Sequence, residues 1–351
     1  MSDFYSEANQ ASLNATVNCS WLELRGGLRG YCVQVIGLVK RLKEQQWPAF
    51  SSKDEGGAVL LSSLTGCQLF ESIIEGIKLD KLDALSLPYN PYLLCFLNLL
   101  SEIKYKVDER ELNADNKEKL LNFSVGFLYS EFSSRKIRLL RYKQEKAYRS
   151  RLKSAYKYID SLHDVYSRIL CVRVDFSYRK GKFIESDNFG EQMREVKNDW
   201  KVMQSKLRVS EVGVDMIGYL LKLEYGLLKG FHYHALIIYN GSKRQQDVVL
   251  GKMLGECWVN DVVPGNDGRY YNCNRYKNRY KNLGIGSINY YEMDKRKNLK
   301  GMVLNYMLKP DDVLDFIGLN ERLFFKGVLK KNFNSCNGRP REKVSINTLE
   351  A

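Results

Sequence analysis

The sequence predicts an α+β protein, in which a helical N-terminal region precedes an antiparallel-sheet domain with helices mainly on one face. Apolar residues recur at helical spacing up to about residue 160, and strand-like alternation begins near residue 165. From there the patterns run strand, helix, hairpin, helix, strand, helix. We therefore expect a helical accessory region at 1–160, a sheet domain at 165–318 and a basic polar tail at 319–351.

The first 160 residues contain helical patterns but no motif that carries chemistry. Apolar side chains recur three and four positions apart, as in Trp21, Leu24 and Leu28. The predicted helices cover Ser20–Lys43, Leu64–Ile77, Tyr92–Val107 and Leu112–Phe132. We interpret this region as a module for interaction or support.

A basic helix is predicted at the end of this region. Between Ser134 and Tyr158, ten lysines and arginines meet one acidic residue, Glu145, and tyrosines interleave with them. Such a helix suits a phosphate backbone, and it equally suits a solvated helix face. Both interpretations stay open.

The sheet domain begins where the pattern changes to alternation and β-forming residues. Its predicted elements are a strand at Ile169–Tyr178, a helix at Asp187–Leu207, hairpin strands at Val214–Leu223 and Ala235–Tyr239, a helix at Gln245–Asn260, a strand at Ile285–Tyr291 and a helix at Lys295–Leu308.

The charge balance favours a polyanionic partner. The 351 residues include 55 lysines and arginines against 41 acids, a formal charge of +14. Nucleic acid is the first candidate and an anionic membrane the second. Membrane insertion is not expected, because no stretch approaches the roughly 18 apolar residues of a spanning helix. The N-terminus does not resemble a secretory signal, and the eight cysteines form no Cys-x-x-Cys pair, so we expect a cytoplasmic protein with reduced thiols.

A candidate metal site lies on the predicted hairpin. Alternation places His232 and His234 on one face of a strand and Tyr233 on the other. A hairpin folded about Leu228 brings Glu224 opposite His232 on the same face. One carboxylate and two imidazoles suit an open Mg²⁺ or Mn²⁺ site. The alternative is a sheet surface that happens to carry two histidines.

The last predicted helix carries a candidate nucleophile. Tyr306 and Lys309 are three residues apart, so they can share a helix face, and Pro310 ends the helix just beyond them. A phenol needs a nearby cation or base to attack at neutral pH, and Lys309 is a candidate. The alternative is a packed tyrosine beside a solvated lysine.

A basic loop with tyrosines is predicted between Gly265 and Gly284. Unpaired bases stack on aromatic rings, and cations attract phosphates, so the loop suits single-stranded DNA; a solvated loop is the alternative. The candidate DNA-binding residues are Arg269, Arg275, Lys277, Arg279 and Lys281.

The chain resembles the HUH endonucleases, and within them the inovirus-type replication initiators of filamentous phages and their YagK/YfjJ-like relatives. The likeness covers about residues 165–315. It is carried by Leu-Lys-Leu-Glu-Tyr-Gly, Lys-Gly-Phe-His-Tyr-His, Gly-Ile-Gly and Leu-Asn-Tyr-Met-Leu-Lys-Pro-Asp-Asp. Tyr233 departs from the aliphatic residue usual between the histidines.

The resemblance implies a ferredoxin-like, Rep-type sheet and a rolling-circle replication initiator. Glu224, His232 and His234 would hold Mg²⁺ or Mn²⁺, while Asp175 would be a further ligand, a group behind the ligands or a structural residue. Tyr306 would attack one strand of single-stranded or supercoiled origin DNA, assisted by Lys309, and would leave a 5′-phosphotyrosine.

The resemblance also implies partners and a rival function. Host helicase and polymerase would complete replication in the bacterial cytoplasm. A helicase or ATPase activity in this polypeptide is not expected, because the sequence has no Gly-x-x-x-x-Gly-Lys-Ser/Thr loop. The alternative function is a DNA-binding regulator derived from such an initiator that no longer cuts.

Overall fold

The computed structural model divides the chain into two compact units. One comprises residues 1–148, 225–228 and 310–321, and the other comprises 149–224, 229–309 and 322–351. The structure describes residues 27–44, 64–78, 90–104, 114–180, 182–183, 189–226, 230–263, 265–311 and 322–328.

The first unit is helical, as the sequence predicts. Tyr31 and Leu38 of α2 pack in one apolar core with Phe96 of α4 and Leu121 of α5. Asn90 caps α4 by accepting hydrogen bonds from the two backbone amides that follow Pro91. The helices are α2 (Gly27–Glu44), α3 (Leu64–Lys78), α4 (Pro91–Ile103), α5 (Ala114–Ser133) and the first part of α6 (Arg135–Val165).

The basic segment forms the continuous helix α6, which is longer than the predicted basic helix. Its sequence passes from the first unit to the second between Tyr148 and Arg149.

The second unit is built on an antiparallel sheet, which confirms the predicted α+β class. Within the described residues the strand order is β4-β1-β3-β2-β6, and β5 pairs with β1 beyond the part of β1 that β4 covers. The strands are β1 (Arg168–Tyr178), β2 (Met216–Gly226), β3 (Gly230–Asn240), β4 (Gly268–Asn272), β5 (Gly286–Asn289) and β6 (Phe324–Lys326).

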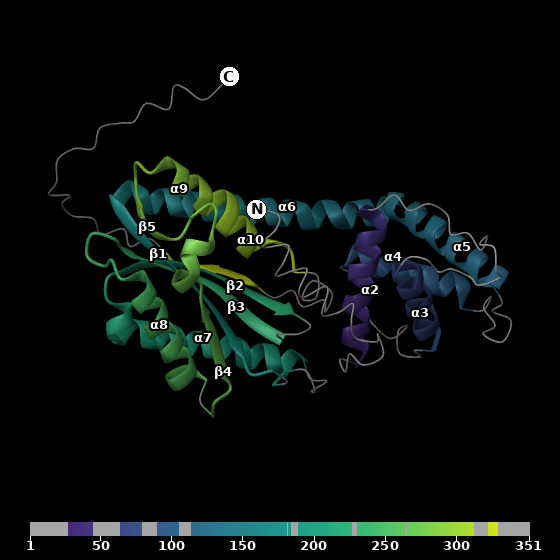
Figure 1. The fold of residues 1–351 in the computed structure, drawn as a ribbon, viewed down its shortest axis with the longest axis horizontal. Coiled ribbons are helices and arrows are strands. Elements are labelled where there is room, and N and C mark those ends of the chain that lie inside the picture. The colour runs from purple at the N-terminus through teal and green to yellow at the C-terminus, as the bar shows by residue number, and fades with distance from the viewer. Residues whose placement is uncertain are drawn as a thin grey trace, which may run out of the picture. The chain divides into compact units, whose positions relative to one another are not determined.

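Helices α7 (Phe189–Val209) and α8 (Asp247–Cys257) cover one face of this sheet (Figure 1). Tyr233 of β3 anchors that side, since its hydroxyl donates to the Val196 carbonyl at 3.1 Å. The Tyr233 ring packs near Trp200 and near Trp258, the first residue of the wide turn η4 (Trp258–Val262). The tyrosine between the two histidines is therefore a buried packing residue.

The opposite face also carries helices, where the sequence predicts helices mainly on one face. The second part of α6 packs there, because Tyr158 closely approaches Gly218 of β2. A continuous helical run of α9 (Met293–Asn298), the wide-turn segment η6 (Leu299–Leu304) and α10 (Asn305–Leu308) packs there as well, since the ring of Tyr306 contacts that of His234.

Two short strands differ from the sequence interpretation. Residues 268–272, expected in a loop, form β4 against β1, and residues 324–326, assigned to the tail, form β6 against β2. Both strands are short and lack a regular apolar alternation, so the sequence pattern does not reveal them. Most of the predicted tail lies outside the described residues.

Gly230 gives a test of the hairpin. Its φ is +65°, where an added Cβ is strained, so we expect Gly230→Ala to lower the free energy of unfolding by about 1–2 kcal/mol. Gly126 lies exposed in α5 with open space around it, so Gly126→Ala is expected to stabilise the protein by about 0.5–1 kcal/mol. Urea denaturation of both variants measures the two effects, and equal changes would contradict the assigned backbone conformation.

Candidate metal centre

Three neighbouring strands bring the site residues together. In the pairing of β1 with β3, Asp175 lies opposite His234 and Ser177 opposite His232, so these four side chains share one face of the sheet. Glu224 reaches the same place from β2, the neighbour of β3 on its other side. The predicted convergence of one acid with two histidines is therefore present.

The three side chains meet at one buried point. The Oε2 atom of Glu224 lies 3.3 Å from Nε2 of His234 and 3.7 Å from Nε2 of His232. The possible ligand atoms of all three residues lie within 4.8 Å of one another. None of these residues is more than 8 % exposed. This group can hold a metal ion.

The outer nitrogen of each imidazole already has a partner. Nδ1 of His234 is 2.8 Å from Oδ1 of Asp175, and Nδ1 of His232 is 3.1 Å from the carbonyl oxygen of Gly230. Both partners accept hydrogen bonds, which assigns the Nδ1–H tautomer to each neutral ring. The lone pairs of both Nε2 atoms then point toward Glu224, and this is the arrangement that a cation requires.

The carboxylate of Glu224 supports the same fit. Its Oε1 atom is buried and has no hydrogen-bond partner among the described residues. A buried carboxylate oxygen without a partner is costly, and a bound cation would remove that cost. The donor set of two imidazoles and one carboxylate is compatible with Mn²⁺ and, with added waters, Mg²⁺.

A proton and a metal cation compete for the space between Glu224 and the Nε2 atoms of His232 and His234. Burial by itself lowers the pKa of His234, but Asp175 and Glu224 outweigh burial and raise it. Burial, with the charge on His234, lowers the pKa of His232 to about 4. Burial raises the pKa of Glu224, yet the hydrogen bond and charge of His234 lower it to about 2 overall. Metal binding requires deprotonated ligands, so it displaces the proton.

Asp175 orients His234 rather than joining the group of possible ligands. Its pKa is lowered, because the charges of His234 and Arg173 outweigh the effect of burial. The Oδ1 atom of Asp175 also lies 3.5 Å from Nη2 of Arg173. The sequence left three roles open for Asp175. The geometry favours the one in which Asp175 hydrogen-bonds to a possible ligand without being a ligand itself.

Arg173 and Lys222 are two buried cations that the sequence reasoning missed. They are 4 % and 1 % exposed, and each lies two residues before a site carboxylate on the same strand, Asp175 and Glu224 respectively. Side chains two residues apart on a strand lie on the same face. A lysine or arginine among the apolar residues of a strand, two positions before a site carboxylate, was therefore the sequence signal that could have identified them. They place positive charge beside the carboxylates of the candidate metal centre.

The Tyr306 ring lies next to His234 of the candidate metal centre. The centroid of its ring is 5.5 Å from that of His234, and its side chain is half-buried. Nζ of Lys309 and Cζ of Arg173 lie 4.8 and 4.9 Å from the Tyr306 ring centroid. Lys309 has left the helix with ψ at 151°, because the residue before a proline avoids helical geometry.

The candidate DNA-binding residues fall into two groups. Arg269, Arg275, Arg279 and Lys281 are exposed, although Arg269 also donates hydrogen bonds to the carbonyls of Asn266 and Gly268. Lys277 instead forms an ion pair with the buried Asp247, at 2.6 Å. Its position favours a structural contribution.

A stack of aromatic and cationic side chains borders the site. Tyr271 of β4 lies opposite Asp175 in the strand pairing, so it shares the face of the metal centre, and it is 47 % exposed. Its ring stacks on Tyr276 at 5.4 Å, and the guanidinium of Arg279 lies 4.8 Å from the centre of the Tyr276 ring. Tyr276 belongs to the short helix η5 (Cys273–Arg279). Such a surface can accept an unpaired base.

Metal binding by this group predicts a stability change. Mn²⁺ at about 100 times its dissociation constant should raise the free energy of unfolding by about 2.7 kcal/mol, because only the folded hairpin gathers the ligands. Glu224→Gln should abolish most of this gain, whereas Glu256→Gln, at an exposed residue that pairs with Lys252, should keep it. Thermal denaturation with and without Mn²⁺ measures the difference. Equal gains in both variants would exclude Glu224 as a ligand.

Comparison with known proteins gives one family match. The family model described as YagK/YfjJ C-terminal domain matches residues 132–313, which is more than half of the chain and includes every residue of the candidate metal centre. No curated protein and no solved structure matches the chain. No helix in the described parts is both long and apolar enough to cross a membrane.

Proposed function

The chain belongs to the YagK/YfjJ C-terminal domain family, and from this premise and the geometry of its site we propose that it is a metal-dependent DNA nicking and strand-transfer endonuclease. We place it with the HUH endonucleases, as an inovirus-type initiator of rolling-circle replication. Its partner would be single-stranded or supercoiled origin DNA in the bacterial cytoplasm, with host helicase and polymerase extending the nicked strand.

One observation carries the proposal. Two imidazole Nε2 atoms and a carboxylate oxygen face one another in a buried place, and the tyrosine ring next to them lies close to two cations. A structural role for the histidines does not account for an additional tyrosine and lysine at the same place. Phosphoryl transfer through a tyrosine accounts for all of them.

Each side chain then has a role in the nicking step. When bound, Mg²⁺ or Mn²⁺ supplies positive charge that polarises the scissile phosphate and stabilises the departing 3′ oxygen. The Tyr306 oxygen loses its proton and bonds to phosphorus, while the bond from phosphorus to the 3′ oxygen breaks and that oxygen takes up a proton. Lys309 and Arg173 orient the phosphate and stabilise negative charge.

The same residues serve the reverse step. The phosphotyrosine bond conserves the energy of the broken phosphodiester, so a new 3′-OH can attack it, restore the DNA strand and release Tyr306. Within the motif, Tyr306 is the tyrosine that a lysine follows at the required spacing, so one tyrosine would perform both cleavage and rejoining.

The aromatic stack supports a single-stranded substrate. Tyr271 and Tyr276 would hold an unpaired base beside the metal centre, while Arg275 and Arg279 would contact phosphates. Lys277 would support the stack indirectly through its ion pair with Asp247.

The nucleophile can be tested directly. Incubation of the protein with single-stranded origin DNA and Mn²⁺ should give a covalent adduct on a denaturing gel. Tyr306→Phe should keep DNA binding and lose the adduct, because the attacking oxygen is gone. Tyr290→Phe and Tyr291→Phe are the matched controls and should keep it. A protein that binds DNA but never forms an adduct would be the non-cleaving regulator instead.

The DNA-contacting arginines predict a change in salt dependence. Arg275→Gln with Arg279→Gln should reduce the slope of log affinity against log salt by about 1.4 for a single-stranded oligonucleotide, if each contacts one phosphate. Lys277→Gln should mainly lower stability, because it leaves Asp247 without its ion pair. Fluorescence anisotropy at several salt concentrations measures the slope, and an unchanged slope would remove these arginines from the DNA path.

A further inference from the structure

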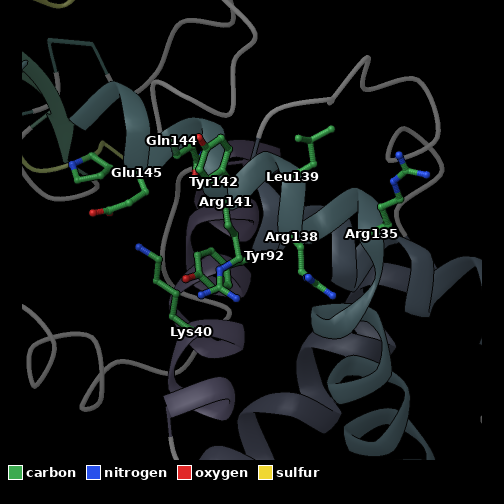
Figure 2. A pocket seen from close by; sticks show the side chains of 10 residues that line it. Lys40, Tyr92, Arg135, Arg138, Leu139, Arg141, Tyr142, Gln144 and Glu145 are labelled. Carbon is green, nitrogen blue, oxygen red and sulfur yellow. The ribbon is translucent and has the colours of Figure 1, made fainter. Parts of the chain in front are cut away.

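The helical unit contains a basic recess of about 1100 Å³, and none of its lining residues belongs to the candidate metal centre (Figure 2). We call it the α6 recess. All of its lining residues belong to that unit, and most of them come from α6. They are Lys40, Tyr92, Arg135, Arg138, Leu139, Arg141, Tyr142, Gln144, Glu145 and Pro310.

The α6 recess carries a surplus of positive charge. Four of its lining residues are cationic and one, Glu145, is acidic. Lys43 lies close by, and both its Nζ and that of Lys40 lie over the ring of Tyr92, at 5.7 and 5.2 Å from its centre. Burial lowers the pKa of Lys43, and the nearby charge of Arg141 lowers it further. An anion in the recess would relieve this crowding of like charges.

The α6 recess also offers exposed apolar surface beside its cations. Tyr142 is 63 % exposed and Leu139 is 50 % exposed, although both are large hydrophobic side chains. On α6, Leu139 follows Arg138 directly, and Tyr142 lies four residues after it. Figure 2 shows these side chains in the lining of the recess. A ligand that satisfies the recess therefore combines negative charge with a flat apolar group.

We propose that the α6 recess binds a short stretch of single-stranded DNA, with phosphates on Arg138 and Arg141 and a base against Tyr142. Phosphates meet the guanidinium groups, and unpaired bases present the flat faces that tyrosine stacks upon. A small ligand usually occupies roughly 300–1,000 Å³, so the recess is large enough for more than one nucleotide. This gives the chain a second DNA-binding site, outside the nicking site.

The experiment compares two variants of the full chain that each lose two positive charges from α6. The recess variant is Arg138→Gln with Arg141→Gln. The control variant is Lys136→Gln with Lys143→Gln, at exposed residues that do not line the recess. Both carry Tyr306→Phe and are measured in EDTA, so that cleavage does not affect the result. Circular dichroism checks that both retain their helices.

Anisotropy of a labelled 12-nucleotide oligothymidylate gives the first measurement. The recess variant should bind about tenfold more weakly, with a salt slope reduced by about 1.4, while the control variant stays near the parent. Tyr142→Ala keeps the charges and should also weaken binding about tenfold through lost stacking. Equal losses in the recess and control variants would overturn the proposal, because they would indicate nonspecific charge attraction.

Cross-linking identifies the place of contact. An oligonucleotide containing 4-thiothymidine should cross-link to peptides that carry Tyr92 or Tyr142, and the recess variant should lose these cross-links. Cross-links confined to residues 265–309 would overturn the proposal. A competition experiment gives a second contradicting outcome. If polyglutamate or free thymidine triphosphate, at a carboxylate or phosphate concentration equal to that of the oligonucleotide phosphates, displaces the oligonucleotide from these peptides, the proposal is overturned.

The outcome is separate from that of the nicking proposal. Adduct formation depends on Tyr306 and the metal centre, whereas binding in the α6 recess is measured without metal and without that tyrosine. A protein that never forms an adduct can still bind DNA in the recess, and loss of the recess leaves the chemistry at Tyr306 in place.

Discussion

The candidate centre depends on two hydrogen bonds that fix the imidazoles of the central hairpin. Asp175 and the Gly230 carbonyl each accept from an Nδ1 atom, so both Nε2 lone pairs are turned toward Glu224. Without these acceptors, each ring could rotate or change tautomer, and the ligand atoms would not converge. The acceptors come from β1 and from the beginning of β3, so the sheet itself positions the group.

The packing on the other side of the sheet makes that position rigid. Tyr233 lies between the two histidines in sequence and points to the opposite face, where its hydroxyl and ring are held by α7 and η4. A strand that is anchored through the intervening residue cannot slip by one position without burying both histidines on the wrong face. This explains how a tyrosine can replace the aliphatic residue expected there.

Much of this arrangement could be predicted because it follows from local periodicity. Alternation in β3 placed both histidines on one face, and helical spacing placed Tyr306 near Lys309. Arg173 was missed, because a single charged residue in an apolar strand is expected to be exposed unless its ion-pair partners are known. The edge strand β4 was missed because its two tyrosines favour strands but stand among a glycine, an arginine and an asparagine, in a stretch of five residues without apolar alternation. Pairing with strands that are distant in sequence determines whether such a segment becomes a strand and whether such a charge is buried. The sequence of the segment alone does not contain that information.

The position of Tyr306 shows how local irregularity and tertiary packing combine. The segment η6 that precedes it has the wide turns of a π-helix, which rotate the following residues relative to a regular α-helix. Pro310 then ends the helix, so Lys309 folds back over the Tyr306 ring instead of continuing along the helix axis. Such wide turns are less stable than α-helical ones and persist where the surrounding structure supports them. Here they place the Tyr306 ring, two cations and His234 in one neighbourhood, and the proposed phosphoryl transfer depends on this arrangement.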